Sequence, residues 1–302
     1  MIGGSTMGLI RTEGLQKPSK NDGRNLGLAH KTNVLDKFKQ NVQFKSFAWC
    51  YDKFFDVIKA DTPELREQVY NIRHQVYCDE YGFESARTGK KIEHDAYDEN
   101  SCHALLIHKK QDRPVGTVRI VLPNQKNLLK SFPLQEIFAP GRLKDELNVQ
   151  SMCEISRLCI LKDFRRRSTD HQLISGVQPQ DEQSRVDVLG NKISRRVVPF
   201  GPIGLLKACM EMSVDKGCDR ACAIMEPRLI KSLERLGIIC ERLGPAMEYK
   251  GLRQPVLIDY YSASNHMRLN QKAVWDVMTS HGALHEKVVR VRKEKEDQLT
   301  IN

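Results

Sequence analysis

A short apolar stretch that carries two opposite charges constrains the fold of this sequence more than any other feature. Residues 153–160 read CEISRLCI, which is typical of a strand buried on both faces, yet the stretch contains Glu154 and Arg157. An ionised side chain in such a strand is costly unless it is paired and hydrogen-bonded. The two charges therefore form either a structural ion pair that fixes the register of a sheet or part of an acid–base site.

The spacing of these two charges complicates both interpretations. Successive residues of a strand point to opposite faces, so Glu154 and Ser156 should share one face and Arg157 should lie on the other. A β-bulge adds one residue to one strand and would bring Glu154 and Arg157 to the same side. If the two charges act together, the sequence predicts a bulge in this strand.

Composition limits the class of protein. Of the 302 residues, 40% are hydrophobic, which is enough for a real core, and 48 Lys and Arg against 38 Asp and Glu give a net charge of +10. This charge favours an acidic partner: nucleic acid, anionic lipid or an acidic carrier protein. No basic run interleaved with aromatic residues supports nucleic-acid binding, and no run of 18 apolar residues predicts a membrane span. Nine cysteines without a CxxC pair predict reduced thiols, so we expect a cytoplasmic protein.

The order of the elements predicts one α+β domain with a mixed central sheet flanked by helices. A disordered leader (1–32) and an N-terminal helical extension (33–51) precede this domain (52–262), which contains a mobile insertion at about 163–198; a C-terminal helix and charged tail (263–302) follow. The first helix should begin at a capping box of Asp61 and Glu64 around Pro63. Strands are predicted at 55–61, 102–110, 114–123, 153–160, 220–226, 238–249 and 255–261, and further helices at 134–138, 202–217, 227–237 and 267–278. No G-x-G-x-x-G or G-K-[ST] motif supports dinucleotide or nucleotide chemistry.

Four separated blocks carry a resemblance to a known family. The series IRHQVYCDEYGFE (72–84), HDAYDEN (94–100), GTVRIVLP (116–123) and CEISRLCI resembles the acyl-homoserine lactone autoinducer synthases and the N-acyl amino acid synthases. The resemblance covers about residues 55–260 and is closest to the PEP-CTERM/exosortase system-associated acyltransferases, which the segment RLGPAMEYKGLRQP suits best. It implies the GNAT acyltransferase fold with a bulged central strand, and an enzyme that moves an acyl group from a thioester to the amine of an amino acid or similar acceptor.

The same resemblance implies a set of site residues. Glu154, Arg119 and Arg157 would be catalytic, with Glu154 and Arg157 as a pair. The residues that would bind the acceptor are Arg73, Tyr77, Phe83, Asp95, Asp98 and Ser156. Phe83 departs from the lactone synthases, which usually have Trp there. Arg157, Asp95 and Asp98 could instead brace the sheet and the loop without taking part in chemistry.

Such a cluster suits the aminolysis of a thioester. A protonated amine cannot attack a carbonyl, so a carboxylate must remove its proton, directly or through water; Glu154 is the candidate. A backbone N–H of the bulged strand near residues 158–160 could stabilise the oxyanion. We expect Leu158, Cys159, Ile160 and Met225 to contact the acyl chain or pantetheine arm, although Cys159 also reads as a core residue. Met210, Met212 and Met225 are core residues or line an acyl tunnel.

The donor is predicted from a missing loop. Coenzyme A users of this fold usually carry a Q/R-x-x-G-x-G/A loop after the central strand, and here that position reads KDFRRRSTDHQ, without glycine. This favours the phosphopantetheine of acyl carrier protein, with Lys162, Arg165, Arg166 and Arg167 as docking residues, although PFGPIG (199–204) keeps coenzyme A open. A coenzyme A-dependent acetyltransferase and an inactive scaffold that binds an acidic partner are the alternatives. No tightly bound cofactor is expected, and His94, Asp98, Cys102 and His103 do not have the spacing of a metal site.

Overall fold

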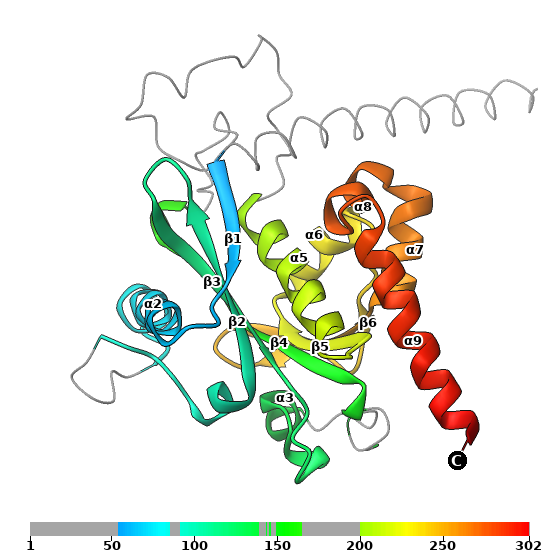
Figure 1. Cartoon of the computed structure of the whole chain (residues 1–302). Helices are drawn as coiled ribbons and strands as arrows, with labels where there is room; N and C mark the ends of the chain where they lie inside the picture. Colours follow the sequence, from blue (N-terminus) through cyan, green and yellow to red (C-terminus); the bar gives the residue numbers. More distant parts are fainter. Residues whose placement is uncertain are drawn as a thin grey trace, which may run out of the picture. The chain divides into compact units, whose positions relative to one another are not determined.

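A computed structural model of the chain describes residues 54–84, 91–138, 143, 145, 149–164 and 200–301 (Figure 1). Residues 41–302 form one compact unit, to which all of the described residues belong. The predicted leader (1–32), the helical extension (33–51) and all but the first two residues of the predicted insertion (163–198) lie outside the described residues.

One mixed sheet forms the centre of this unit. Its strands are β1 (Phe55–Lys59), β2 (Ser101–His108), β3 (Arg113–Val121), β4 (Met152–Ile160), β5 (Arg220–Met225), β6 (Glu241–Arg242), β7 (Met247–Glu248) and β8 (Leu252–Asp259). The strand order is β1-β2-β3-β4-β5-β8-β6, with β7 paired to β8. All pairs are antiparallel except β4 with β5, which is parallel. The predicted α+β class with a mixed sheet is therefore confirmed.

Helices cover both faces of the sheet. They are α2 (Pro63–His74), which continues as a π-helix (Gln75–Glu80), a 3-10 helix (Ala96–Asn100), α3 (Pro133–Ile137), α5 (Phe200–Asp215), α6 (Pro227–Arg235), α7 (Tyr260–Asn270), α8 (Lys272–Met278) and α9 (Ala283–Ile301). Figure 1 shows α2 and α5 on opposite sides of β2 and β3. The predicted cap of α2 was wrong: Thr62, not Asp61, accepts a hydrogen bond from the backbone N–H of Leu65 (3.3 Å). Pro63 occupies the first turn as predicted.

The central strand β4 carries the predicted bulge. In the β3–β4 register Thr117 faces Cys159 and Arg119 faces Ser156, so a step of two residues on β3 faces a step of three on β4. Arg157, inside the bulge, has a φ of +51°, which is unusual for a residue with a Cβ atom. A charged residue at such a position indicates a local geometry that the surrounding contacts enforce. The bulge turns the chain so that Arg157 faces the same side of the sheet as Arg119 (see below).

The parallel pairing of β4 and β5 ends where the bulge begins. Their register runs from Met152 with Arg220 to Ile155 with Ala223, while β4 continues to Ile160 and β5 to Met225. Beyond Ile155 the two strands therefore have no register with each other, so β5 does not pair with this part of β4.

Gly116 sits where β3 approaches the bulged strand most closely. A Cβ atom on Gly116 would lie 2.8 Å from the carbonyl oxygen of Cys159 and 2.9 Å from Cγ1 of Ile160. Because a backbone oxygen in a central strand cannot move away, we expect Gly116→Ala to lower the free energy of unfolding by about 1–3 kcal/mol. Urea denaturation of purified protein measures this change. Gly244→Ala is the control, since its nearest neighbour, Pro255, is 3.6 Å away, and equal losses in the two variants would contradict the packing described.

The C-terminal part differs from the sequence prediction. The predicted strand at 238–249 is reduced to the two short strands β6 and β7, on either side of Gly244 and Pro245. The predicted strand at 255–261 ends at Asp259, whose side chain accepts the N–H of Ser262 (2.8 Å) and caps α7. The predicted single helix at 267–278 is two helices, α7 and α8, followed by the long α9.

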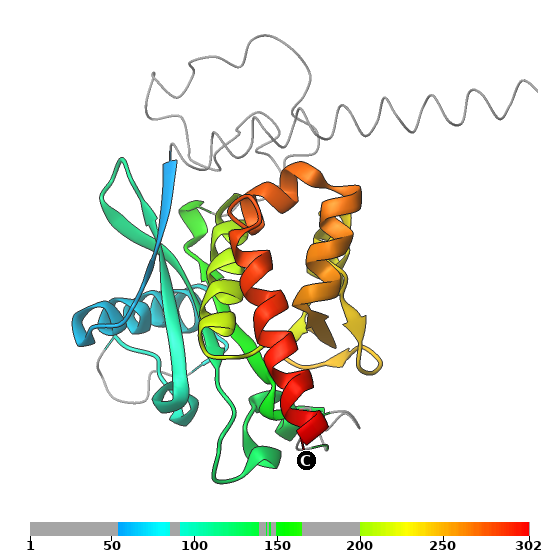
Figure 2. The same ribbon diagram turned by 45° about the vertical axis from the view of Figure 1, so that its right-hand side comes forward.

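Of these three C-terminal helices, α8 and α9 pack against α5 on the side away from α2, and α7 packs against α8, α9 and β8 (Figure 2). Tyr260, Met267, Trp275 and Val288 belong to the same hydrophobic core as the sheet. Arg292 of α9 binds both oxygens of Asp259 at 3.0 Å and ties this helix to the end of β8. In the part of the chain that the structure describes, no helix is long and apolar enough to cross a membrane.

Candidate active site

Three arginines and three carboxylates form one cluster on the α2 side of the sheet. Each arginine comes from a different element, and the carboxylates come from the segment that leads into β2. The members are Arg73 of α2, Arg119 of β3, Arg157 of β4, and Glu93, Asp95 and Asp98. The side chains of Arg73 and Arg119 are completely buried. Buried arginines are tolerated only when they are paired, and here each of them binds two carboxylates.

Asp98 is the deepest acceptor of the cluster. It receives hydrogen bonds from Nη1 of Arg73 (2.6 Å) and Nη1 of Arg119 (2.8 Å) through the same oxygen, Oδ1. Its other oxygen accepts the backbone N–H of Asp95 (2.8 Å). Burial alone would raise the pKa of Asp98, but the two arginines outweigh it and hold the pKa well below its usual range. Asp98 is therefore ionised whenever the protein is folded and near neutral pH.

The bulge brings Arg157 into this cluster. Its Nη2 lies 3.0 Å from Oε1 of Glu93 and 2.9 Å from Oδ2 of Asp95, and its guanidinium lies over the ring of Tyr77 at 5.6 Å. Arg73 binds Glu93 as well. Burial raises the pKa of Glu93, yet the charges and hydrogen bonds of Arg73 and Arg157 overcome this effect and lower it. The sequence reasoning missed Glu93, although it directly precedes the block HDAYDEN.

Glu154 does not pair with Arg157, which corrects the expected ion pair. The structure describes both side chains and shows no hydrogen bond or ion pair between them; Oε2 of Glu154 instead accepts the backbone N–H of Leu134 in α3 (2.8 Å). Glu154 is 2% exposed, and burial raises its pKa to about 7. It shares its face of the sheet with Arg119 and Ser156, because Val121 faces Glu154 and Arg119 faces Ser156 in the register. Glu154 is thus a carboxylate beside the cluster whose hydrogen-bond partner is a backbone N–H and not an arginine.

Of the other predicted acceptor-binding residues, Ser156 and Tyr77 contact the cluster or the bulge, whereas Phe83 does not. Ser156 accepts a hydrogen bond from Nε of Arg119 (3.0 Å), and the Tyr77 hydroxyl donates to the carbonyl of Leu158 in the bulge (3.4 Å). Phe83 stands apart: it is 37% exposed and stacks on Tyr81, with the ring centroids 4.9 Å apart. The structure therefore brings Arg73, Arg119, Arg157, Asp95, Asp98 and Ser156 together, with Glu154 beside them, and places Phe83 on the surface.

The predicted acyl-binding residues lie on β4 and β5 beyond the part in which the two strands pair. Cys159, Ile160 and Met225 are buried and Leu158 is partly buried. Burial raises the pKa of Cys159 to about 12, so it is a protonated thiol, as the core interpretation predicts. An apolar cavity of about 30 Å³ lies on the opposite face of the sheet, lined by residues that include Ile155, Met210 and Met267. None of the four predicted residues lines this cavity.

The predicted docking residues are only partly described. Lys162 is exposed, and its backbone N–H binds Glu80 (3.1 Å). Arg165, Arg166 and Arg167 lie outside the described residues. Within the described ranges, no three His, Cys, Asp or Glu side chains are arranged to hold a metal ion.

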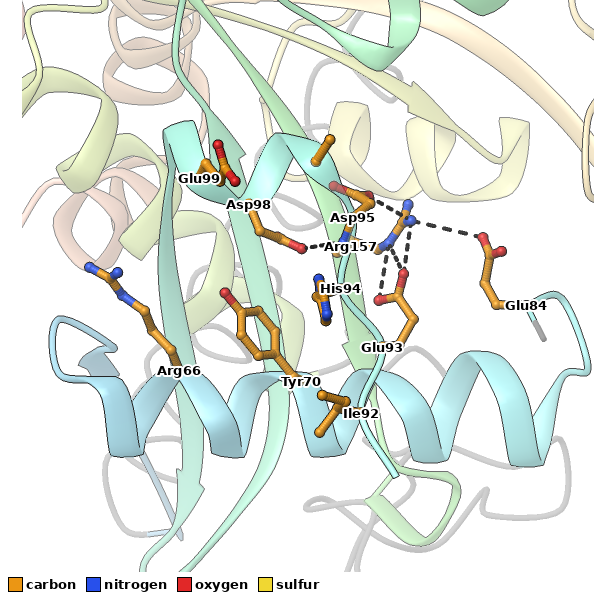
Figure 3. A pocket seen from close by; sticks show the side chains of 11 residues that line it. Arg66, Tyr70, Glu84, Ile92, Glu93, His94, Asp95, Asp98, Glu99 and Arg157 are labelled. Atoms are coloured by element: carbon orange, nitrogen blue, oxygen red, sulfur yellow. Dashed lines mark hydrogen bonds and ion pairs between the residues drawn. The ribbon is translucent and has the colours of Figure 1, made fainter. Parts of the chain in front are cut away.

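A cavity of about 500 Å³ opens over the ion-pair cluster (Figure 3). Its wall consists of one side of α2, the segment from Ile92 to Glu99, and Arg157. Figure 3 shows Glu93, Asp95 and Arg157 pointing toward one another at one side of this cavity. A small acceptor could therefore reach the bulge of β4 from the α2 side.

Comparisons with known proteins give a family and several solved structures. Residues 72–175 match the family described as acetyltransferase (GNAT) domain. No curated protein sequence matches the chain.

Three of the matching structures are two acyl-homoserine lactone synthases and one N-acyl amino acid synthase. The coenzyme A-dependent acyl-homoserine lactone synthase BjaI, with SAM and isopentyl-CoA, is 19% identical, with 79% of this chain and 98% of that chain covered and a TM-score of 0.47. The lactone synthase LasI is 14% identical, with 73% and 94% covered and a TM-score of 0.48. FeeM, an N-acyl amino acid synthase from uncultured soil microbes, is 13% identical, with 72% and 98% covered and a TM-score of 0.48.

The family match begins in the last turn of α2 and includes Arg73, the other members of the ion-pair cluster and the bulged strand β4. The mixed eight-stranded sheet flanked by helices is thus that of a GNAT-type acetyltransferase domain, and the protein is an acyltransferase.

Proposed function

We propose that the protein is an N-acyltransferase that moves a fatty acyl group from the thioester of acyl carrier protein to the amine of an amino acid or similar small acceptor. Its place would be the cytoplasm, and its closest kin would be the PEP-CTERM/exosortase system-associated acyltransferases that the sequence blocks resemble. The observation that carries the proposal is Glu154, a buried carboxylate with a pKa of about 7 beside the place where β4 and β5 cease to pair.

The diverging strands suit a thioester donor. An extended pantetheine arm carries amide groups that can hydrogen-bond to the edge of β4 after Ile155, where the register with β5 has ended. The thioester carbonyl would then lie next to Arg157 and Leu158, which the register between β3 and β4 skips. A backbone N–H of this bulge is a fixed donor for the oxyanion of the tetrahedral intermediate.

The charges of the site indicate which carboxylate is the base. Glu93, Asp95 and Asp98 are each bound to arginine, and the pKa values of Glu93 and Asp98 are lowered, so Glu93 and Asp98 hold protons poorly. Glu154 has a pKa near the pH at which it must work, which is the condition for efficient general base catalysis. We therefore assign proton removal to Glu154, directly or through a water molecule.

The proposed reaction follows from these roles. The acceptor ammonium loses one proton to Glu154, and the free amine forms a C–N bond to the thioester carbon. The negative charge on the carbonyl oxygen is stabilised by the backbone donor of the bulge. The intermediate then collapses, the C–S bond breaks, and Glu154 gives its proton to the departing thiolate; the nitrogen loses its second excess proton to Glu154, which releases it to water. The products are an amide and the free thiol of the donor.

Reversing the charge of the predicted docking residues tests whether acyl carrier protein is the donor. Arg165, Arg166 and Arg167 follow β4, and an acidic carrier would be attracted to them more strongly at ~0.1 M salt, where the Debye length is ~10 Å, than at ~1 M, where it is ~3 Å. We expect the triple substitution of these arginines by Glu to raise KM for the acyl carrier protein substrate about 10-fold or more at low salt and to leave kcat unchanged. Steady-state kinetics at two salt concentrations measures both constants.

A small acyl-pantetheine donor is the control, because it lacks the carrier surface and should not respond to the triple substitution. Equal loss with both donors would place the arginines in the site or in the fold instead. A coenzyme A thioester that is the better substrate at every salt concentration would favour the coenzyme A-dependent alternative, in which PFGPIG before and within the first turn of α5 would receive the pyrophosphate.

Lipid extracts from cells that overproduce the protein test the function itself. Mass spectrometry should find a new N-acyl species that is absent from cells producing Glu154→Gln. If no N-acyl species forms with any amine supplied, the proposal fails and the protein is an inactive scaffold.

A further inference from the structure

The large cavity contains two charged residues that the ion-pair cluster does not use. Glu93, Asp95 and Asp98 are bound by Arg73, Arg119 and Arg157, and Glu84 is bound by Lys250. Arg66 and Glu99 also line the cavity, and neither has an ion-pair partner among the residues that the structure describes. The only side-chain hydrogen bond of Arg66 in this part of the chain is a long one of 3.4 Å from Nε to the carbonyl of Ala60.

These two unpaired charges lie at the end of the cavity away from the bulge. Figure 3 shows Arg66 and Glu99 toward one end and Arg157 and Glu84 toward the other. Arg66 precedes Arg73 by seven residues on α2, so the two Cα positions are separated by about 10 Å along the helix. A molecule that contacts both ends must therefore be longer than the amino and carboxylate groups of one α-carbon.

Two side chains give the middle of the cavity apolar surface, next to His94 and Asp98, which line it as well. The ring of Tyr70 and the side chain of Ile92 lie between the two charged ends, and both are partly buried (Figure 3). A chain of methylene groups could rest against these two side chains, because burying apolar surface there is favourable. The cavity thus presents one anion and one cation at its outer end, apolar surface from Tyr70 and Ile92 in its middle, and Arg157 of the bulge at its inner end.

We propose that the acceptor is a diamino acid that is acylated on its side-chain amine. Its α-carboxylate binds Arg66, its α-ammonium binds Glu99, and its methylene chain lies on Tyr70 and Ile92. The side-chain ammonium at the inner end loses a proton to Glu154 through a water molecule, because Glu154 does not line the cavity, and the free amine then forms the C–N bond to the thioester carbon as the C–S bond breaks and the donor thiol leaves. This inference rests on the proposed function and specifies the acceptor class and the nitrogen that reacts.

Four amines of the same chain length test the contact with Arg66 and the contact with Glu99 separately. L-Lysine has both the carboxylate and the α-amine, 6-aminohexanoate has only the carboxylate, 1,5-diaminopentane has only the second amine, and pentylamine has neither. With an acyl carrier protein donor, we expect Arg66→Gln to raise KM about 10-fold for lysine and 6-aminohexanoate, the size of one charge-assisted hydrogen bond, and to leave the other two unchanged. Glu99→Gln should raise KM for lysine and 1,5-diaminopentane only. Arg290→Ala, an exposed residue of α9, is the control and should change none of the four.

The position of the acyl group in the product is a second, independent test of this inference. Fragmentation of the lysine product by mass spectrometry should place the acyl group on the side-chain nitrogen in the wild-type protein. Acylation of the α-nitrogen, or an equal rise in KM for all four amines in Arg66→Gln, overturns the inference and leaves the proposed function standing. The same holds if a different amine is acylated while all four of these are not. If no amine of any kind is acylated, the proposed function fails, and this inference with it.

Discussion

Replacing Glu154 by glutamine should lower kcat for acyl transfer by about 10²- to 10⁴-fold while the protein stays folded. Glutamine keeps the size of the side chain and can still accept the backbone N–H of Leu134, but it cannot take a proton from the acceptor amine. Because the pKa of Glu154 is raised to about 7, kcat/KM of the wild-type protein should rise with pH through this value as the carboxylate ionises. Steady-state kinetics between pH 5.5 and 8.5 measures the profile, which Glu154→Gln should lose.

The stability of the same variant separates a catalytic role from a structural one. A carboxyl group whose pKa is higher in the folded than in the unfolded protein contributes stability below its unfolded pKa, and this contribution is lost as the pH rises through its folded pKa. For Glu154 the two values are about 4.5 and about 7, so the wild-type protein buries an ionised carboxylate at pH 8. Glu154→Gln should therefore be at least as stable as the wild type at pH 8, with a gain of up to about 3 kcal/mol. A variant that unfolds at pH 8, or one that is folded and fully active, would contradict the assignment.

Replacing Arg119 by methionine should lower the free energy of unfolding by about 3–5 kcal/mol. Arg119 is completely buried and binds Asp95, Asp98 and Ser156 at once, so its removal takes one of two arginine partners from each of the two carboxylates in the interior. Chemical denaturation measures the loss, and Arg228→Met on the exposed side of α6 is the matched control, expected to change stability by less than about 0.5 kcal/mol.

A second variant keeps this prediction testable if Arg119→Met does not fold. Arg119→Lys retains the charge but cannot reproduce the fork of Nε and Nη1 that holds Ser156 and the two aspartates, so it should fold and show an intermediate loss of stability. If Arg119→Met costs less than about 1 kcal/mol, the cluster does not hold the loop and the strand together in the way described.

The bulge of β4 could be predicted because charge and spacing conflicted in the sequence. An apolar strand containing Glu154 and Arg157 is difficult to bury as a regular strand, and an added residue resolves the conflict, as the register with β3 confirms. The partner of Arg157 could not be predicted in this way. Glu93 lies 64 residues before Arg157 in the sequence, and its position depends on how the segment before β2 crosses the sheet. Side-chain pairing across such distances is a property of the tertiary structure and leaves no periodic pattern.

The start of α2 and the end of β8 were predicted at the wrong residues, and each error has a local cause. At the start of α2, Asp61 and Thr62 are both good caps, and the backbone of the chain as it leaves β1 decides in favour of Thr62. At the end of β8, the apolar run continues through Tyr260 and Tyr261, but Asp259 caps a helix there because α7 packs its buried side into the core. Periodicity identifies an element in both cases, whereas the exact end depends on a hydrogen bond that the sequence alone does not specify.

Release of the donor thiol in the presence and absence of an acceptor amine tests the central claim most directly. Purified protein is incubated with a fatty acyl thioester of acyl carrier protein, the free thiol is followed with a colorimetric thiol reagent, and the product is identified by mass spectrometry. We expect thiol release that depends on the amine, equals the amount of amide formed, and disappears in Glu154→Gln. Thiol release at the same rate without amine, or in the Glu154→Gln variant, would contradict aminolysis with Glu154 as the base.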